Sequence, residues 1–355
     1  MLKMTKVWLV LLSLIGVLST PVCAESPNLK GFAVDLNQNS VSGLSSGAFM
    51  TAQLATAYSA NFIGAGVIAG GPFYCSGTYK STGEMQNAMT TCMNPLSKYV
   101  GPDARISFQN AVKFANEGKV DPVENLKKQR VYAFSGSSDL TVKTLVVDQV
   151  PLYYQIAGVP TANIMYNSNI NAGHSIVTNN SNDEPCSVTR APYINNCGFE
   201  QSHVLLNHIY GGLNPPTTSD KLSGKIIAFN QKEFVRGNRN SMSDNAYIYV
   251  PKACETETCR VHIAFHGCQQ GADHIGDRYY STTGYNEMAD TNKIIVLYPQ
   301  AHRSEPIPFN PRGCWDFWGY SSEDPSNLDF YTKNSPQMSA IMAMVKRLGE
   351  PRPTN

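Results

Sequence analysis

The feature that most restricts how this chain can fold is a serine between two glycines, in the segment Gly-Leu-Ser-Ser-Gly at residues 43–47. Strand-compatible residues 40–42 precede it, and helix-compatible residues 48–59 follow. A serine in a sharp strand-to-helix turn has strained backbone angles, and side chains at the glycine positions would collide with the neighbouring strand and helix. The segment therefore predicts that Ser45 is a nucleophile at a helix N-terminus, whose N–H groups favour negative charge. Ser46 is the competing nucleophile, although its position suits a backbone donor better.

A serine nucleophile needs a base, and the base needs a third group to orient it. Asp139 comes shortly after a predicted strand at residues 130–134, and His174 follows another at 162–166. Functional groups of α/β sheets gather outside the carboxyl ends of the strands, and the order Ser, Asp, His is that of α/β-hydrolases. We therefore expect Ser45, Asp139 and His174 to form a catalytic triad. The alternatives are a turn-forming aspartate and a solvated loop histidine.

Short apolar or β-rich runs alternate with helix-compatible stretches along the chain. The predicted strands are residues 63–68, 130–134, 162–166, 246–250, 260–265 and 293–298, and the predicted helices are residues 48–59 and 337–348. Near-continuous apolar runs are typical of parallel strands that are buried on both faces. We expect an α/β fold with a mostly parallel central sheet, helices on both faces and one catalytic domain over residues 25–355. The proline-containing residues 214–218 are interpreted as a surface connection within that domain.

A His-Gly-Cys segment at residues 266–268 directly follows the predicted strand 260–265. Such a turn supplies an oxyanion-hole N–H in α/β-hydrolases, where it normally precedes the nucleophile. Here it lies far downstream of Ser45. A circular permutation explains this order, because the termini of a domain usually lie close together at its surface. We expect the backbone N–H groups of Ser46 and Cys268 to be the oxyanion donors. The alternative is that the histidine of this segment is only a packed residue, and in either case it is structural.

The first 24 residues have the layout of a secretory signal peptide. Two lysines precede an apolar run at residues 7–18, and small residues precede a cleavage site expected after Ala24. The apolar run is short for a bilayer span, which disfavours an uncleaved anchor, and the residues before Cys23 fit lipid attachment poorly. We expect a secreted protein, extracellular or periplasmic, with no membrane span. Its mature chain, residues 25–355, is expected to carry no separate substrate-binding module.

Eight cysteines remain after the expected cleavage site, and an even number in an exported chain indicates disulfides. Nearness in sequence favours three pairs and leaves a fourth: Cys75–Cys92, Cys186–Cys197, Cys254–Cys259 and Cys268–Cys314. The alternative is a zinc site, but no Cys-x-x-Cys pair and no clustered histidines accompany these cysteines. We expect neither a metal nor a cofactor.

The chain carries 28 basic and 27 acidic residues. Removing the two lysines of the first 24 residues leaves 26 against 27, a net charge of −1. A basic stripe for nucleic acid and an acidic tail are both missing from this pattern. We therefore expect no nucleic-acid partner, and we expect a monomer.

Several segments jointly resemble extracellular poly(3-hydroxybutyrate) depolymerases of the single-domain, fungal type, which have a circularly permuted α/β-hydrolase fold. The matching segments are residues 41–47, 69–75, 135–139, 192–197, 266–268, 298–301 and 313–316. The resemblance implies Ser45, Asp139 and His174 as the triad and the N–H groups of Ser46 and Cys268 as oxyanion donors. It also implies that Trp315 faces the polymer. The alternative for Trp315, as for its aromatic neighbours Trp318 and Tyr320, is packing in the core.

The resemblance implies a serine esterase that hydrolyses poly(3-hydroxybutyrate)-type polyester through an acyl-enzyme. Residues 79–121 are longer than the family pattern and rich in Met and Asn, and residues 303–311 also depart from it. One alternative is therefore a secreted carboxylesterase for another substrate, such as feruloyl or acetylated polysaccharide esters. The other is a catalytically silent binding protein on the same scaffold, against which the complete set of candidate residues argues.

Overall fold

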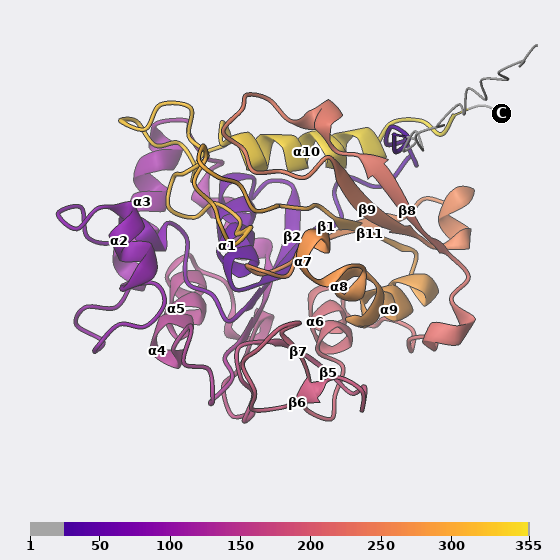
Figure 1. The fold of residues 1–355 in the computed structure, drawn as a ribbon, viewed down its shortest axis with the longest axis horizontal. Helices are drawn as coiled ribbons and strands as arrows, with labels where there is room; N and C mark the ends of the chain where they lie inside the picture. Colours follow the sequence, from indigo (N-terminus) through magenta and orange to yellow (C-terminus); the bar gives the residue numbers. More distant parts are fainter. Residues whose placement is uncertain (1–24, 354–355) are drawn as a thin grey trace, which may run out of the picture.

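The computed structural model describes residues 25–353, which form an eight-stranded sheet with helices on both faces (Figure 1). The expected signal peptide, residues 1–24, lies outside the described part of the chain. The strands of the sheet are β1 (Asn39–Leu44), β2 (Phe62–Ile68), β3 (Arg130–Phe134), β4 (Ile164–Asn167), β8 (Lys225–Asn230), β9 (Asn245–Val250), β10 (Arg260–Phe265) and β11 (Ile294–Tyr298). Their spatial order is β4-β3-β2-β1-β10-β11-β9-β8, and only the pairs that involve β9 are antiparallel. The expected mostly parallel sheet is confirmed.

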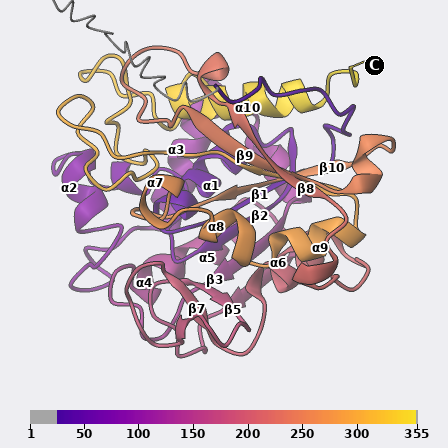
Figure 2. The same cartoon turned by 45° about the vertical axis from the view of Figure 1, so that its right-hand side comes forward.

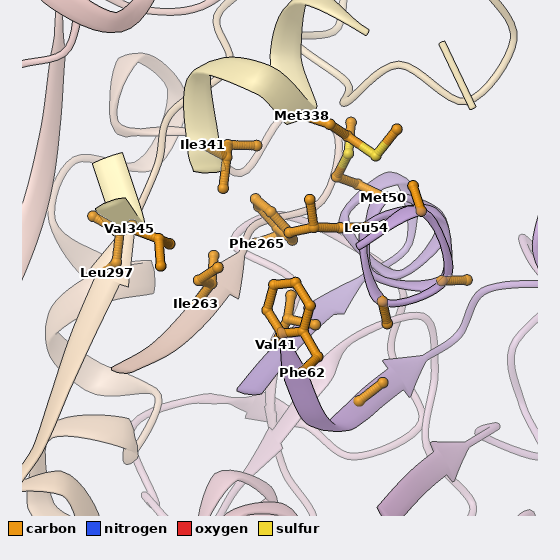
Figure 3. Packing of buried hydrophobic residues seen from close by; sticks show 14 of the residues in the cluster. Val41, Met50, Leu54, Phe62, Ile263, Phe265, Leu297, Met338, Ile341 and Val345 are labelled. Atoms are coloured by element: carbon orange, nitrogen blue, oxygen red, sulfur yellow. The ribbon is translucent and has the colours of Figure 1, made fainter. Parts of the chain in front are cut away.

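Helices cover the two faces of this sheet, as Figure 2 shows from a second direction. They are α1 (Ser46–Ala57), α2 (Glu84–Met89), α3 (Ala104–Asn116), α4 (Thr144–Val147), α5 (Gln149–Ile156), α6 (Gln201–Tyr210), α7 (Ala272–Ile275), α8 (Arg278–Thr282), α9 (Tyr285–Thr291) and α10 (Pro336–Leu348). Alternate strand residues face opposite layers. Val41, Ile263 and Leu297 pack with α1 and α10 (Figure 3), whereas Ala264 and Val296 belong to the cluster that contains α6 and α9.

All six predicted strands and both predicted helices are present, with ends shifted by two residues at most. The edge strand β8 was not predicted. Three of its six residues are exposed, and the apolar run at residues 226–229, the signal that could have indicated the strand, was overlooked. A small second sheet of β5 (Ile176–Thr178), β6 (Glu184–Pro185) and β7 (Ile194–Asn196) was also not predicted, because strands of two or three residues are too short to show a period.

The chain order of the strands is permuted relative to their positions in space. If the sheet strands are read along the chain starting at β8, and reading continues at the N-terminus after the C-terminus, their order is β8, β9, β10, β11, β1, β2, β3, β4. In this cyclic order the strand that precedes the His-Gly-Cys segment comes before the strand that precedes Ser45, as in an unpermuted α/β-hydrolase. The fold is a circularly permuted α/β-hydrolase, as expected.

The two ends of the described chain meet where the permutation requires it. The Phe32 N–H donates to the Leu348 oxygen, and the Ala33 N–H donates to the Glu350 oxygen, each at 2.9 Å. At Gly31 a side chain has no room, since a Cβ atom there would lie 2.4 Å from the Glu350 oxygen. The end of α10 therefore continues in space into the segment that leads to β1, although no peptide bond joins them.

Four disulfides hold the surface loops, and they confirm the predicted pairing. The bonds are Cys75–Cys92, Cys186–Cys197, Cys254–Cys259 and Cys268–Cys314. Cys186–Cys197 encloses β7, and Cys268–Cys314 joins the loop after β10 to the long segment between β11 and α10. Within residues 25–353, none of the helices has the length and apolar character that a membrane span needs.

Because residues 32–33 are hydrogen bonded to residues 348–350, we predict that the two ends of the chain can be joined by a linker and new termini opened elsewhere. A permutant in which a short Gly/Ser linker joins residue 353 to residue 25, opened between the exposed Pro215 and Pro216, would have the unpermuted strand order. We expect it to fold with native near-ultraviolet circular dichroism, because the same contacts form and exposed connections tolerate new termini. A permutant that is soluble but lacks native tertiary signal would contradict this view of the junction.

Candidate active site

Ser45 occupies the tight turn that the sequence predicts. It joins β1 to α1 with φ 57° and ψ −122°, a strained conformation for a residue with a side chain. The flanking glycines are sterically required. A Cβ atom on Gly43 would lie 2.4 Å from the Gly47 oxygen, and one on Gly47 would lie 2.5 Å from the His266 oxygen. The glycines thus allow α1 to approach both its own strand and the loop after β10.

Asp139 and His174 are brought together by the loops after β3 and β4. The His174 Nδ1 atom lies 2.7 Å from the Asp139 Oδ2 atom, and both residues are buried. The other carboxylate oxygen of Asp139 accepts the N–H groups of Thr141 and Val142 at 2.8 and 2.9 Å. Since three donors fix this carboxylate, it can hold the imidazole in one orientation and tautomer, with the proton on Nδ1.

The sheet places Ser45 at the same edge as this pair. β1, β2, β3 and β4 are neighbours and all parallel, so the loops after them leave the sheet on one side. The Ser45 N–H donates to the Ile68 oxygen at the end of β2, and the Ser138 N–H donates to the Ala172 oxygen, which joins the two partner loops. Within residues 25–353 the structure records no hydrogen bond from Ser45 Oγ to the His174 ring. Such bonds are often long in free enzymes and shorten when substrate binds.

Two backbone N–H groups, one at a helix start and one in a loop, belong to segments beside Ser45. Ser46 is the first residue of α1, and Cys268 lies in the loop after β10, the strand that pairs with β1. A Cβ atom on Gly267 would lie 3.3 Å from the Ser45 Cβ atom, so this loop passes directly beside the serine. In the described part of the chain neither N–H is recorded with an acceptor. An oxyanion hole needs N–H groups that are free to donate, and the assignment of these two as its donors stays a prediction.

His266 begins this loop and is fully buried. The Ala301 N–H donates to His266 Nε2 at 3.1 Å, so the ring proton is on Nδ1, which donates to the Gly267 oxygen at 2.7 Å. Burial lowers the pKa of His266 to about 4, which keeps the ring neutral. Both nitrogens are occupied, and this histidine is a structural residue, as the sequence indicated.

Trp315 does not lie where the sequence prediction placed it. The side chain is 0% exposed and packs against Phe265 and His266, with ring centroids 4.9 and 5.4 Å apart. The ring thus packs behind the loop that follows β10, which favours the alternative of packing in the core. Of the neighbouring aromatic residues, Tyr320 is also buried, and Trp318 is partly exposed.

The hydrogen bonds that support the histidine loop were not predicted from the sequence. The Gly173 N–H donates to the Cys186 oxygen at 2.8 Å, and the His174 N–H donates to Thr189 Oγ1 at 2.9 Å. The buried Asn195 amide donates to three carbonyl oxygens of residues 185–188 and so holds that turn in place. The cysteine pair that brackets this region was the available signal, but its contact with the histidine loop depends on the tertiary fold.

A second buried histidine lies in β10, beside β1, the strand that precedes Ser45. His262 of β10 has hydroxyls on both ring nitrogens, with Ser40 Oγ at 2.7 Å from Nδ1 and Ser42 Oγ at 2.8 Å from Nε2. The Tyr285 hydroxyl lies 2.7 Å from the Ser42 hydroxyl and continues the network. Burial lowers the pKa of His262 to about 3. The neutral ring thereby connects β1 to β10, the two strands that carry Ser45 and the expected oxyanion loop.

The chain was compared with protein-family models and with known proteins. No family model matches the chain. The chain is 41% identical over 342 residues to the poly(3-hydroxybutyrate) depolymerase of Delftia acidovorans, which covers 95% of this chain but 64% of that protein. It is 35% identical over 355 residues to the polyhydroxybutyrate depolymerase of Talaromyces funiculosus, which covers 96% of each.

Solved structures show the same similarity. The crystal structure of the PHB depolymerase from Penicillium funiculosum superposes with a TM-score of 0.78 at 35% identity, over 91% of this chain and 98% of that one. A serine-to-alanine variant of a PHB depolymerase, complexed with an R3HB trimer, matches with the same TM-score at 34% identity and the same coverage.

The Asp139–His174 contact predicts a large effect of Asp139→Asn. The amide keeps the size of the side chain but stabilises the wrong imidazole tautomer, so we expect kcat on an activated ester to fall by about 10⁴-fold. The unfolding temperature should remain close to that of the unchanged protein. The measurement is steady-state hydrolysis of p-nitrophenyl butyrate. A loss of less than about tenfold would show that Asp139 does not orient the base.

The buried His262 predicts a pH dependence of stability. Its pKa is about 3 in the folded chain against 6.5 ordinarily, so the unfolded chain binds a proton that the folded chain excludes between these values. The free energy of unfolding therefore falls as the pH is lowered below about 6.5. His262→Asn should reduce this slope by about 1.4 kcal/mol per pH unit between pH 5.5 and 4. Urea unfolding at several pH values measures it, and equal slopes in both proteins would refute the assignment.

Proposed function

Because the chain belongs to the polyhydroxybutyrate depolymerase family, we propose that it hydrolyses the ester bonds of poly(3-hydroxybutyrate)-type polyester, with Ser45 as the nucleophile. The observation that supports this most strongly is the buried His174–Asp139 pair at the sheet edge where the Ser45 turn lies. The R3HB trimer bound to a structural relative is consistent with the substrate class.

In the proposed reaction Ser45 Oγ attacks the carbonyl carbon of an ester, and His174 Nε2 takes the hydroxyl proton. Asp139 accepts the Nδ1–H and stabilises the imidazolium that forms. The tetrahedral intermediate collapses as the C–O bond breaks, and His174 returns the proton to the leaving alkoxide oxygen. Water then attacks the acyl-enzyme with His174 as base, which frees the acid and restores Ser45.

The N–H groups of Ser46 and Cys268 would stabilise the oxyanion in both steps. Each donor of this kind typically contributes about 3 kcal/mol to the stabilisation of the transition state. The start of α1 adds the partial positive charge of a helix N-terminus at the same point. The negative charge would therefore develop beside two N–H groups for which residues 25–353 provide no recorded acceptor.

The cellular setting is part of the proposal. Four disulfides support an exported protein, since such bonds persist in oxidising compartments. We place the enzyme outside the cytoplasm as a monomer with one catalytic domain over residues 25–355. The Delftia acidovorans relative is longer than this chain, so the two proteins share the catalytic region and differ in total length.

Clearing of a poly(3-hydroxybutyrate) granule suspension tests the substrate class. The unchanged protein should clear the suspension and release 3-hydroxybutyrate oligomers, whereas Ser45→Ala should do neither and should still fold. Hydrolysis of short nitrophenyl esters without any clearing would favour the alternative of a carboxylesterase for small or polysaccharide-linked esters.

A serine-directed alkyl phosphonate separates an enzyme from a silent binding protein. It should label the unchanged protein with one equivalent and leave Ser45→Ala unlabelled, because labelling requires an activated serine. Equal labelling of both proteins would exclude Ser45 as the nucleophile, and absence of labelling in both would favour the binding protein.

A further inference from the structure

The two proposed oxyanion donors lie on separate elements. Ser46 starts α1, and Cys268 lies in the loop after β10. Their strands pair in parallel up to Gly43 and Phe265, and beyond that pair both chains leave the sheet. No backbone hydrogen bond in the described chain joins residues 45–47 to residues 266–268. The distance between the two N–H groups therefore needs another restraint.

One segment contacts both donor residues. Cys314 forms a disulfide with Cys268, and the next residue, Trp315, donates its backbone N–H to Ser46 Oγ at 3.2 Å. The residue after Cys268 also donates its N–H to the Arg312 oxygen at 2.7 Å. Two consecutive residues of the segment thus hold the two halves of the proposed oxyanion hole.

This segment is itself fixed by buried polar contacts. Asn310 Oδ1 accepts the Cys314 N–H, and Asn310 Nδ2 donates to the Cys314 oxygen, both at 2.9 Å. The Tyr320 hydroxyl donates to the same oxygen at 2.6 Å. The Trp315 ring is buried against Phe265 at the end of β10. The segment can therefore act as a rigid part rather than as a loose surface loop.

We propose that residues 310–316 form a clamp that sets the spacing of the two oxyanion donors, with the Ser46 hydroxyl as its positioning group. This inference rests on the proposed function. Ser46 is 1% exposed, and its hydroxyl accepts a backbone N–H, so it is directed into the clamp. Oxyanion donors act only within about 2.7–3.1 Å of the developing charge, and a misplacement of about 1 Å can reduce the rate by about 10²-fold.

Ser46→Ala tests the clamp, because it keeps the proposed backbone donor and removes only the hydroxyl. We expect kcat per active site on p-nitrophenyl butyrate to fall by about tenfold, within the range that misplacement can produce, with KM little changed. Active sites are counted by phosphonate titration, which removes any effect of an unfolded fraction. The affinity for an alkyl boronic acid, which forms a tetrahedral adduct on the nucleophile, should fall by a similar factor.

The matched control is Ser59→Ala. Ser59 is also buried and follows the other end of α1, where its hydroxyl donates to the Pro122 oxygen at 3.3 Å. We expect kcat per active site and boronic acid affinity to stay within about twofold of the unchanged protein, even where the unfolding temperature falls. A purely structural role of Ser46 would make its variant behave like this control.

The disulfide provides a second, independent variant. Replacing Cys268 and Cys314 together with alanine should also lower kcat per active site by about tenfold, for the same reason. Replacing the remote pair Cys254 and Cys259 should not. Because activity is expressed per titrated site, partial misfolding of either double variant does not imitate the effect.

The outcomes distinguish this inference from the function on which it rests. If Ser46→Ala keeps kcat per active site and boronic acid affinity within about twofold, the clamp is wrong. Ser45→Ala is measured in the same series. If Ser45→Ala retains turnover, the proposed function itself fails, whereas an inactive Ser45→Ala beside an unaffected Ser46→Ala rejects the clamp alone.

Discussion

The close approach of α1 to β1 and β10 at Ser45 is the constraint on which the rest of the site depends. Ser45 has a positive φ although it carries a side chain, and the atoms around Gly43 and Gly47 leave no room for a Cβ atom at either position. Such strain persists only where the surroundings hold it, and here all residues of β1 and α1 are buried. The core of the protein is thus organised around a serine at the carboxyl edge of the sheet, which is itself only 8% exposed.

Tertiary order, rather than chain order, determines which groups reach that serine. The loop with Cys268 comes late in the sequence, yet β10 pairs directly with β1. Hydrogen bonds between residues 32–33 and residues 348–350 stand in for the missing peptide connection. Circular permutation therefore preserves the site, because the sheet neighbours and the loops at their ends remain the same.

The elements that could be predicted from the sequence are those with a pattern among residues close together in the chain. Central strands were predicted from continuous apolar runs, and the Ser45 turn from its glycines. The edge strand β8 was missed although residues 226–229 form a short apolar run, and the strands around Asn195 were missed because two or three residues are too few to show a pattern. Trp315 was assigned to the polymer through a family resemblance, but its burial against Phe265 and His266 depends on a disulfide-linked segment whose path no local pattern encodes.

The acyl-enzyme is the most direct test of the account as a whole. A soluble 3-hydroxybutyrate ester is mixed with the protein, the reaction is quenched in acid during the first turnover, and the peptides are mapped by mass spectrometry. The account predicts one 3-hydroxybutyryl group on the peptide that contains residues 43–47, with fragmentation placing it on Ser45. An acyl group on Ser46 or on another residue, or turnover without any covalent intermediate, would contradict it.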